Sequence, residues 1–141
     1  MDLNIESELE GWLDRVKKWL SEDGGISPKV ILLSEERGAI IDPFDLSNRE
    51  AAKRVIECQI KANNAHMVIL IYQAWVSNDL GTFPSIAADR RRALCIYGET
   101  KNEIMMMMQE YEINSNNYVV FGKSSKLKKP LYDALTGFFN S

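Results

Sequence analysis

The chain has 141 residues, of which 45% are hydrophobic and 26% charged, and its formal net charge is −3. This length suits one globular domain, residues 1–141, that buries roughly 68% of the surface its unfolded chain would expose. The acidic balance disfavours a broadly basic nucleic-acid binder, although it leaves room for a local basic patch.

The sequence predicts neither a secretory signal nor a membrane-spanning helix. No apolar run reaches the roughly 18 residues that a membrane-spanning helix needs, and the acidic start MDLNIESELEG lacks both parts of a secretory signal. Cys58 and Cys95 form no C-x-x-C pair, so two reduced and largely buried thiols are expected rather than a metal site. We therefore expect a cytoplasmic protein without a membrane partner.

The first element predicted is an amphipathic helix over residues 3–21, ended by Gly24–Gly25. Its apolar residues recur every three or four positions, and we expect its two tryptophans to pack in the core rather than on a membrane. The apolar positions are Leu9, Trp12, Leu13, Val16, Trp19 and Leu20.

A hairpin and a second helix come next. Residues 29–34 and 39–41 are predicted strands joined by the short turn Glu35-Glu36-Arg37-Gly38. Ser47 and Glu50 fit a capping box, which predicts a helix over residues 48–63. Its predicted buried stripe consists of Ala52, Val55, Ile56 and Ile60.

The stretch from Ala65 to Ser77 is the predicted central strand, because its unbroken apolar run is rich in β-branched residues and too short for a bilayer. Its side chains alternate, so both faces of the sheet need a cover. One face receives Met67, Ile69, Ile71 and Trp75, and the other receives Val68, Leu70, Tyr72 and Val76. Trp75 is expected to be mostly buried and to hold the base of the following loop.

In the second half of the chain, the pattern of residues predicts a long loop, an antiparallel meander and a final helix. The loop, residues 78–88, is longer than most connections in compact domains and is the best candidate for a working surface. The meander strands are residues 92–100, 103–113 and 118–121, followed by a basic linker at 123–129 and a helix at 130–139.

These elements predict an α+β domain with an antiparallel or mixed sheet of about five or six strands. The helix of residues 48–63 packs on one face, and helices at both termini cover the remaining apolar surface. The Met105–Met108 run is expected to fill the core from a strand buried on both sides, with an exposed contact face as the alternative.

Two motifs are set aside. Gly122-Lys123-Ser124 imitates the end of a phosphate-binding loop, but Asn117 occupies the position of its first glycine and no well-formed helix follows. His66 is the only histidine, and no second histidine or nearby cysteine could build a catalytic or metal site around it. We expect His66 to be structural.

The densest positive charge is Arg90-Arg91-Arg92, directly after the long loop. Arginines can grip phosphates or an acidic partner, but in a strand they alternate faces, so at most two point the same way. Without interleaved exposed aromatic residues, nucleic-acid binding is disfavoured. The predicted binding residues are Asn78, Asp79, Phe83, Asp89, Arg90 and Arg91.

Carboxylates offer an alternative function. Asp79, Asp89, Glu99 and Glu103 flank the loop and a hairpin turn, and acids at strand ends can hold a magnesium ion for phosphodiester chemistry. In that alternative, Asp79, Asp89 and Glu99 hold the metal and Arg90 or Arg91 clamps a phosphate. Their spacing matches no specific metal motif.

The middle third of the chain resembles a pattern found in uncharacterised small bacterial and phage proteins. The residues that carry it are Gln73-Ala74-Trp75, then Asp89–Leu94, then Gly98-Glu99. The pattern reads E-A-W, D-R-x-E-A-L and G-E, so Gln73 and Arg92 stand where it has glutamates. The resemblance implies an architecture and no particular reaction.

For function, we expect a non-catalytic interaction protein without a cofactor, encoded by a phage or mobile element as an accessory or inhibitor of a host system. Its partner is another protein, or a second copy of itself in a homo-oligomer, contacted through residues 78–88 and the neighbouring arginines. The alternative is a metal-dependent phosphodiesterase or nucleotide-acting enzyme.

Overall fold

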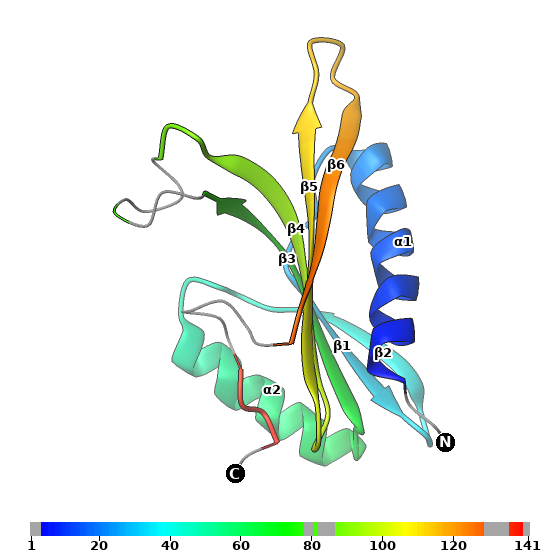
Figure 1. Ribbon diagram of the computed structural model, residues 1–141. Helices are drawn as coiled ribbons and strands as arrows, with labels where there is room; N and C mark the ends of the chain where they lie inside the picture. Colours follow the sequence, from blue (N-terminus) through cyan, green and yellow to red (C-terminus); the bar gives the residue numbers. More distant parts are fainter. Residues whose placement is uncertain (1–3, 78–80, 82–86, 129–135, 140–141) are drawn as a thin grey trace.

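The computed structural model describes residues 4–77, 81, 87–128 and 136–139 (Figure 1). Within them the chain forms two helices and six strands. In chain order they are α1 (Ile5–Asp23), β1 (Lys29–Ser34), β2 (Gly38–Pro43), α2 (Arg49–Asn63), β3 (Met67–Val76), β4 (Arg91–Glu99), β5 (Ile104–Ile113) and β6 (Val119–Leu127). Most of the helix predicted at 130–139 lies outside the described residues, and residues 138–139 are in a turn.

The strands form one sheet in the order β2-β1-β3-β4-β5-β6, and every neighbouring pair is antiparallel. The prediction of an α+β fold is confirmed, and of the two sheet types expected, the antiparallel one is present. Helices α1 and α2 lie on opposite sides of this sheet (Figure 1). Neither helix has the length and hydropathy that crossing a membrane requires.

The alternation predicted for the central strand is confirmed. Met67, Ile69 and Ile71 pack in one buried cluster with the apolar residues of α1. Val68 and Leu70 pack in a second cluster with residues of α2. Because the two clusters lie on opposite faces of the same strand, β3 is buried on both sides over its first half.

Helix α1 begins and ends at recognisable caps. The Asn4 side chain accepts a hydrogen bond from the Ser7 N–H at 3.0 Å, and Gly24 ends the helix with φ of 75°. Lys126 on β6 bridges Glu6 and Glu10 at 2.7 and 2.6 Å and ties the helix to the edge of the sheet.

Three details of α2 differ from the prediction. Cys58 was expected to be largely buried but is exposed. The N-cap is Asn48, whose side chain accepts from the Ala51 N–H at 3.1 Å, whereas the Ser47 N–H donates to Asp45. Val55 was expected in the buried stripe but is 57% exposed. The buried stripe of α2 is limited to Ala52, Ile56 and Ile60, and Val55, about 100° around the helix from Ile56, lies beside this stripe and faces water.

Strands β5 and β6 contain the methionine run and the sequence that imitates a phosphate-binding loop. Met106 and Met107 are buried on opposite faces of β5, which confirms the core role and not the exposed alternative. The predicted strand of residues 118–121 continues to Leu127, so most of the expected basic linker is part of β6. Gly122–Ser124 therefore lie within a strand and do not form a strand-to-helix loop.

Candidate functional site

The predicted binding residues fall into two groups in the structure. Asn78, Asp79 and Phe83 lie outside the described residues, as does most of the loop at 78–88. Asp89, Arg90 and Arg91 lie at the start of β4, where it pairs with the end of β3. The site is therefore built from this end of the β3–β4 pair.

Trp75 is 37% exposed, and the prediction that it is mostly buried is wrong. The reason is the length of α1. The chain leaves this helix at Gly24 and passes over β3 at Gln73, whose side-chain oxygen accepts a hydrogen bond from the Ile26 N–H at 2.9 Å. Trp75 lies on the same face two residues further along β3, beyond the part that α1 covers.

Two arginines flank the exposed tryptophan. The Cζ atoms of Arg90 and Arg92 lie 5.0 and 5.2 Å from the centroid of the Trp75 ring, within the range of cation–π attraction. Arg92 is directly opposite Trp75 in the β3–β4 register. In the described part of the chain neither guanidinium has a carboxylate partner. We call Trp75, Arg90 and Arg92 the arginine–tryptophan surface.

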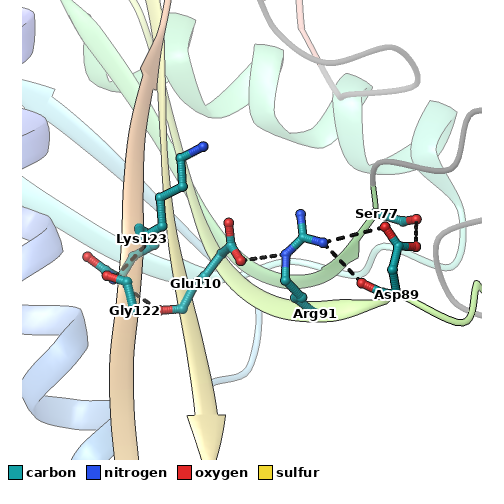
Figure 2. Close-up of polar contacts among 7 residues, drawn as sticks. Ser77, Asp89, Arg91, Glu110, Gly122 and Lys123 are labelled. Carbon is teal, nitrogen blue, oxygen red and sulfur yellow. Dashed lines mark hydrogen bonds and ion pairs between the residues drawn. The ribbon is translucent and has the colours of Figure 1, made fainter.

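The Arg91 side chain lies on the face of the sheet opposite to Trp75 and forms ion pairs with Asp89 and Glu110. Its Nε lies 2.6 Å from Glu110 Oε1, and its Nη1 lies 3.0 Å from the Asp89 carbonyl oxygen and 3.6 Å from Asp89 Oδ2. Ser77 in turn contacts the Asp89 carboxylate (Figure 2). This chain of contacts joins the ends of three strands, so Arg91 and Asp89 are placed as structural residues.

The sequence grouped Arg90 with Arg91, whereas the structure brings Arg90 together with Arg92. The rule that at most two adjacent arginines share a face holds, and the signal for the correct pair was their spacing of two residues. Sequence reasoning left Arg92 out of the predicted binding residues, because it expected Trp75 to be buried and not available as an aromatic partner.

The hollow beside the arginine–tryptophan surface is small. Its volume is about 210 Å³, and its lining residues are Gln73, Ala74, Trp75, Arg92 and Tyr111. The Gln73 amide also donates to the Tyr111 hydroxyl, which fixes the floor of the hollow across the sheet. Cofactor and drug-sized ligands need roughly 300–1,000 Å³, so this hollow suits a single side chain or a small group.

Glu99, one of the predicted metal ligands, has a structural role. It is 2% exposed, and its carboxylate accepts hydrogen bonds from the Tyr97 hydroxyl at 2.5 Å and from the N–H groups of Gly137 and Phe139 at 2.8 and 2.9 Å. Burial, followed by the hydrogen bond to Glu99, raises the pKa of the Tyr97 hydroxyl far above its ordinary value. The carboxylate thus holds the C-terminal turn against the sheet.

The carboxylates proposed to share a metal ion are far apart. Glu99 is the last residue of β4, and Asp89 contacts Arg91, the first residue. The two therefore lie at opposite ends of a strand that is roughly 26 Å long at about 3.3 Å per residue. One cation cannot bind both. Asp79 lies outside the described residues, and the described residues contain no cluster of three potential metal-ligating side chains.

His66 is near neither group. Its backbone N–H donates to the Leu33 carbonyl at 2.8 Å, which continues the pairing of β1 and β3. The side chain borders an open hollow at the other end of the sheet, lined by Asn64, Ala65, His66, Thr100, Lys101, Asn102, Glu103 and Phe139. The residues that line this hollow include neither a second histidine nor a cysteine.

Comparison of the chain with protein-family models, with curated proteins and with solved structures finds no match. The function must therefore be argued from the side chains of the site.

Proposed function

We propose that this is a non-catalytic interaction protein that binds an acidic segment of another protein through the arginine–tryptophan surface. The observation that supports the proposal is the exposed Trp75 ring, with the guanidinium groups of both Arg90 and Arg92 within cation–π distance of it. Tryptophan and arginine are the residues that most often dominate the energetics of protein interfaces.

The chemistry of the surface favours a carboxylate-bearing partner. A guanidinium presents planar paired donors that match a carboxylate, and stacking on an indole ring restricts its orientation before the partner arrives. The adjacent hollow has room for one side chain of the partner. An acidic residue next to an apolar one would therefore fit both parts of the surface.

Single-stranded nucleic acid is the competing partner, because aromatic rings interleaved with arginines also stack bases. The sequence disfavoured nucleic-acid binding because no exposed aromatic residue was expected near the arginines. The exposure of Trp75 removes this argument. Two other observations still favour protein: the net charge is −3, and the third arginine is engaged by Asp89 and Glu110. Few cationic groups remain to follow a phosphate backbone.

We also propose a cytoplasmic location, which the two unpaired cysteines support. The resemblance of the middle third of the chain supports a further proposal, that the protein is encoded by a phage or mobile element. In that setting the arginine–tryptophan surface would dock on a host protein as an accessory or inhibitor.

The test is a fluorescence titration of the full chain with two labelled probes of matched length, an Asp/Glu-rich peptide containing leucine and a single-stranded oligonucleotide. We expect the peptide to bind, and the Arg90→Ala/Arg92→Ala double variant to weaken it at least about tenfold, as for other interface arginines. Trp75→Ala should weaken it as well. The matched control is Arg15→Ala, because Arg15 also stacks on a tryptophan, at 4.4 Å from Trp12, but on α1.

Three outcomes count against the proposal. Arg15→Ala and the double variant could bind the peptide equally, or none of the proteins could bind it. The oligonucleotide could bind more tightly than the peptide and compete with it, which would assign the surface to nucleic acid. Thermal melts of each variant separate lost binding from lost folding.

A further inference from the structure

The two edges of the sheet are unequal. The edge strand β6 is protected: it has a register irregularity opposite Gln109 to Tyr111, and it carries Lys123 and Lys126. Bulges and lysines on an edge prevent pairing with another chain. The other edge strand, β2, has no bulge in its pairing with β1 and no lysine. Its one proline, Pro43, is its last residue, and its Ile41 side chain is 46% exposed.

The outward backbone of β2 follows from its pairing with β1. The Phe44 N–H donates to the Pro28 carbonyl at 3.2 Å, so Phe44 faces β1. Successive residues of an antiparallel strand turn their backbone groups to alternate sides. Ile40 and Asp42 therefore also face β1, whereas Ala39, Ile41 and Pro43 face away from the sheet.

We propose that two copies of this chain pair through antiparallel β2 strands, with a two-fold axis at Ile41. In this register each Ile41 exchanges two backbone hydrogen bonds with Ile41 of the second copy. Each Ala39 N–H meets the Pro43 carbonyl of the other copy, so the missing N–H of proline costs no bond that Ala39 donates. The six-stranded sheet continues across the axis into the second copy.

Charge complementarity favours a second copy of this chain as the partner of β2, and it favours the register centred on Ile41 over the neighbouring registers. Continued one residue before β2 and two residues after it, the register centred on Ile41 brings Arg37 opposite Asp45 of the second copy, twice by symmetry. A shift of two residues toward Ala39 would instead place Glu36 opposite the second copy's Asp42, which is a like-charge pair. A shift the other way would centre the pair on Pro43, which cannot donate.

The expected dimer is weak. A specific stable interface buries roughly 1,200–2,000 Å² in total, and one pair of six-residue strands with a single exposed isoleucine supplies less. Association should therefore be in the micromolar range or above. This inference stands on β2 and is independent of the arginine–tryptophan surface.

The test is sedimentation equilibrium of the full chain up to about 200 µM, high enough to populate a micromolar dimer. We expect reversible dimerisation that Ile41→Lys weakens at least about tenfold, because the two introduced lysines face each other across the axis. The matched control is Val120→Lys, since Val120 is 51% exposed on the protected edge strand β6. It should leave the dimer unchanged.

A charge swap provides the second test and does not touch the strand itself. Arg37→Asp should weaken the dimer, and Arg37→Asp combined with Asp45→Arg should restore it. Arg37 also donates to Asn63 at 2.9 Å, so Asn63→Ala controls for loss of that bond and should dimerise normally. A wild-type chain that stays monomeric overturns the proposal, as does a dimer that survives Ile41→Lys or a double swap that fails to restore pairing.

Discussion

Replacement of Gly98 by alanine tests how closely α1 packs on the sheet. Gly98 lies in β4 on the face that α1 covers. A Cβ at this position would lie 2.8 Å from Leu9 Cδ2 and 3.3 Å from Ile5 Cγ1. Leu9 is fully buried and Ile5 is 5% exposed, so neither side chain can swing into solvent. The first turns of α1 must move away from the sheet instead.

The cost follows from these distances. The nearest contact falls roughly 0.6 Å short of ordinary van der Waals separation, and overpacking of this kind costs about 1–3 kcal/mol. The substitution also removes the conformational freedom of a glycine in the unfolded chain, which returns about 0.5–1 kcal/mol. We expect a net loss of about 1–2 kcal/mol in the free energy of unfolding. At an unfolding entropy of about 2.1 cal/mol/K per residue, this lowers the melting temperature of a chain of this size by about 3–7 °C.

Thermal and urea unfolding of the two variants Gly98→Ala and Gly11→Ala provide the assay. Gly11 lies in α1 with no atom within 4 Å of its added Cβ, so the same chemical change there should raise the free energy of unfolding by about 0.5–1 kcal/mol. Opposite signs for the two variants would support the packing described. A Gly98→Ala variant as stable as the parent would show that α1 does not rest on β4 at this point.

Three further predictions concern single side chains. Glu99→Gln should cost about 1–3 kcal/mol, because its amide nitrogen would face a backbone N–H of the C-terminal turn, and hydrogen exchange of that turn should accelerate. In the native protein a thiol reagent at about pH 8 should label exposed Cys58 and not Cys95, because burial raises the pKa of the Cys95 thiol to about 12; denaturant should expose both. The hydrogen bond from Lys126, and then its positive charge, lower the pKa of the Glu6 carboxyl in the folded protein. The Glu6–Lys126 ion pair therefore contributes stability at pH values above the unfolded-state pKa of Glu6, and this contribution is lost as the pH falls through the folded-state pKa. In an NMR titration Lys126→Met should return the Glu6 midpoint to its ordinary range, and an unchanged midpoint would contradict the contact.

The sequence by itself determined the elements and their faces. Periodicity is a local property, so the three- and four-residue spacing in α1 and the alternation in β3 could be read without knowing what covers them. The same alternation assigned Met67 and Val68 to opposite clusters. The antiparallel meander followed from the short connections between the last three strands.

Only the tertiary structure decided the site. Exposure of Trp75 depends on where the chain leaves α1 relative to β3, and contacts between segments some 50 residues apart set that point. The pairing of Arg92 with Trp75 depends on the β3–β4 register. Glu99 became structural because the C-terminal turn reaches its carboxylate. Each outcome rests on contacts between distant segments, which local patterns of residues do not encode.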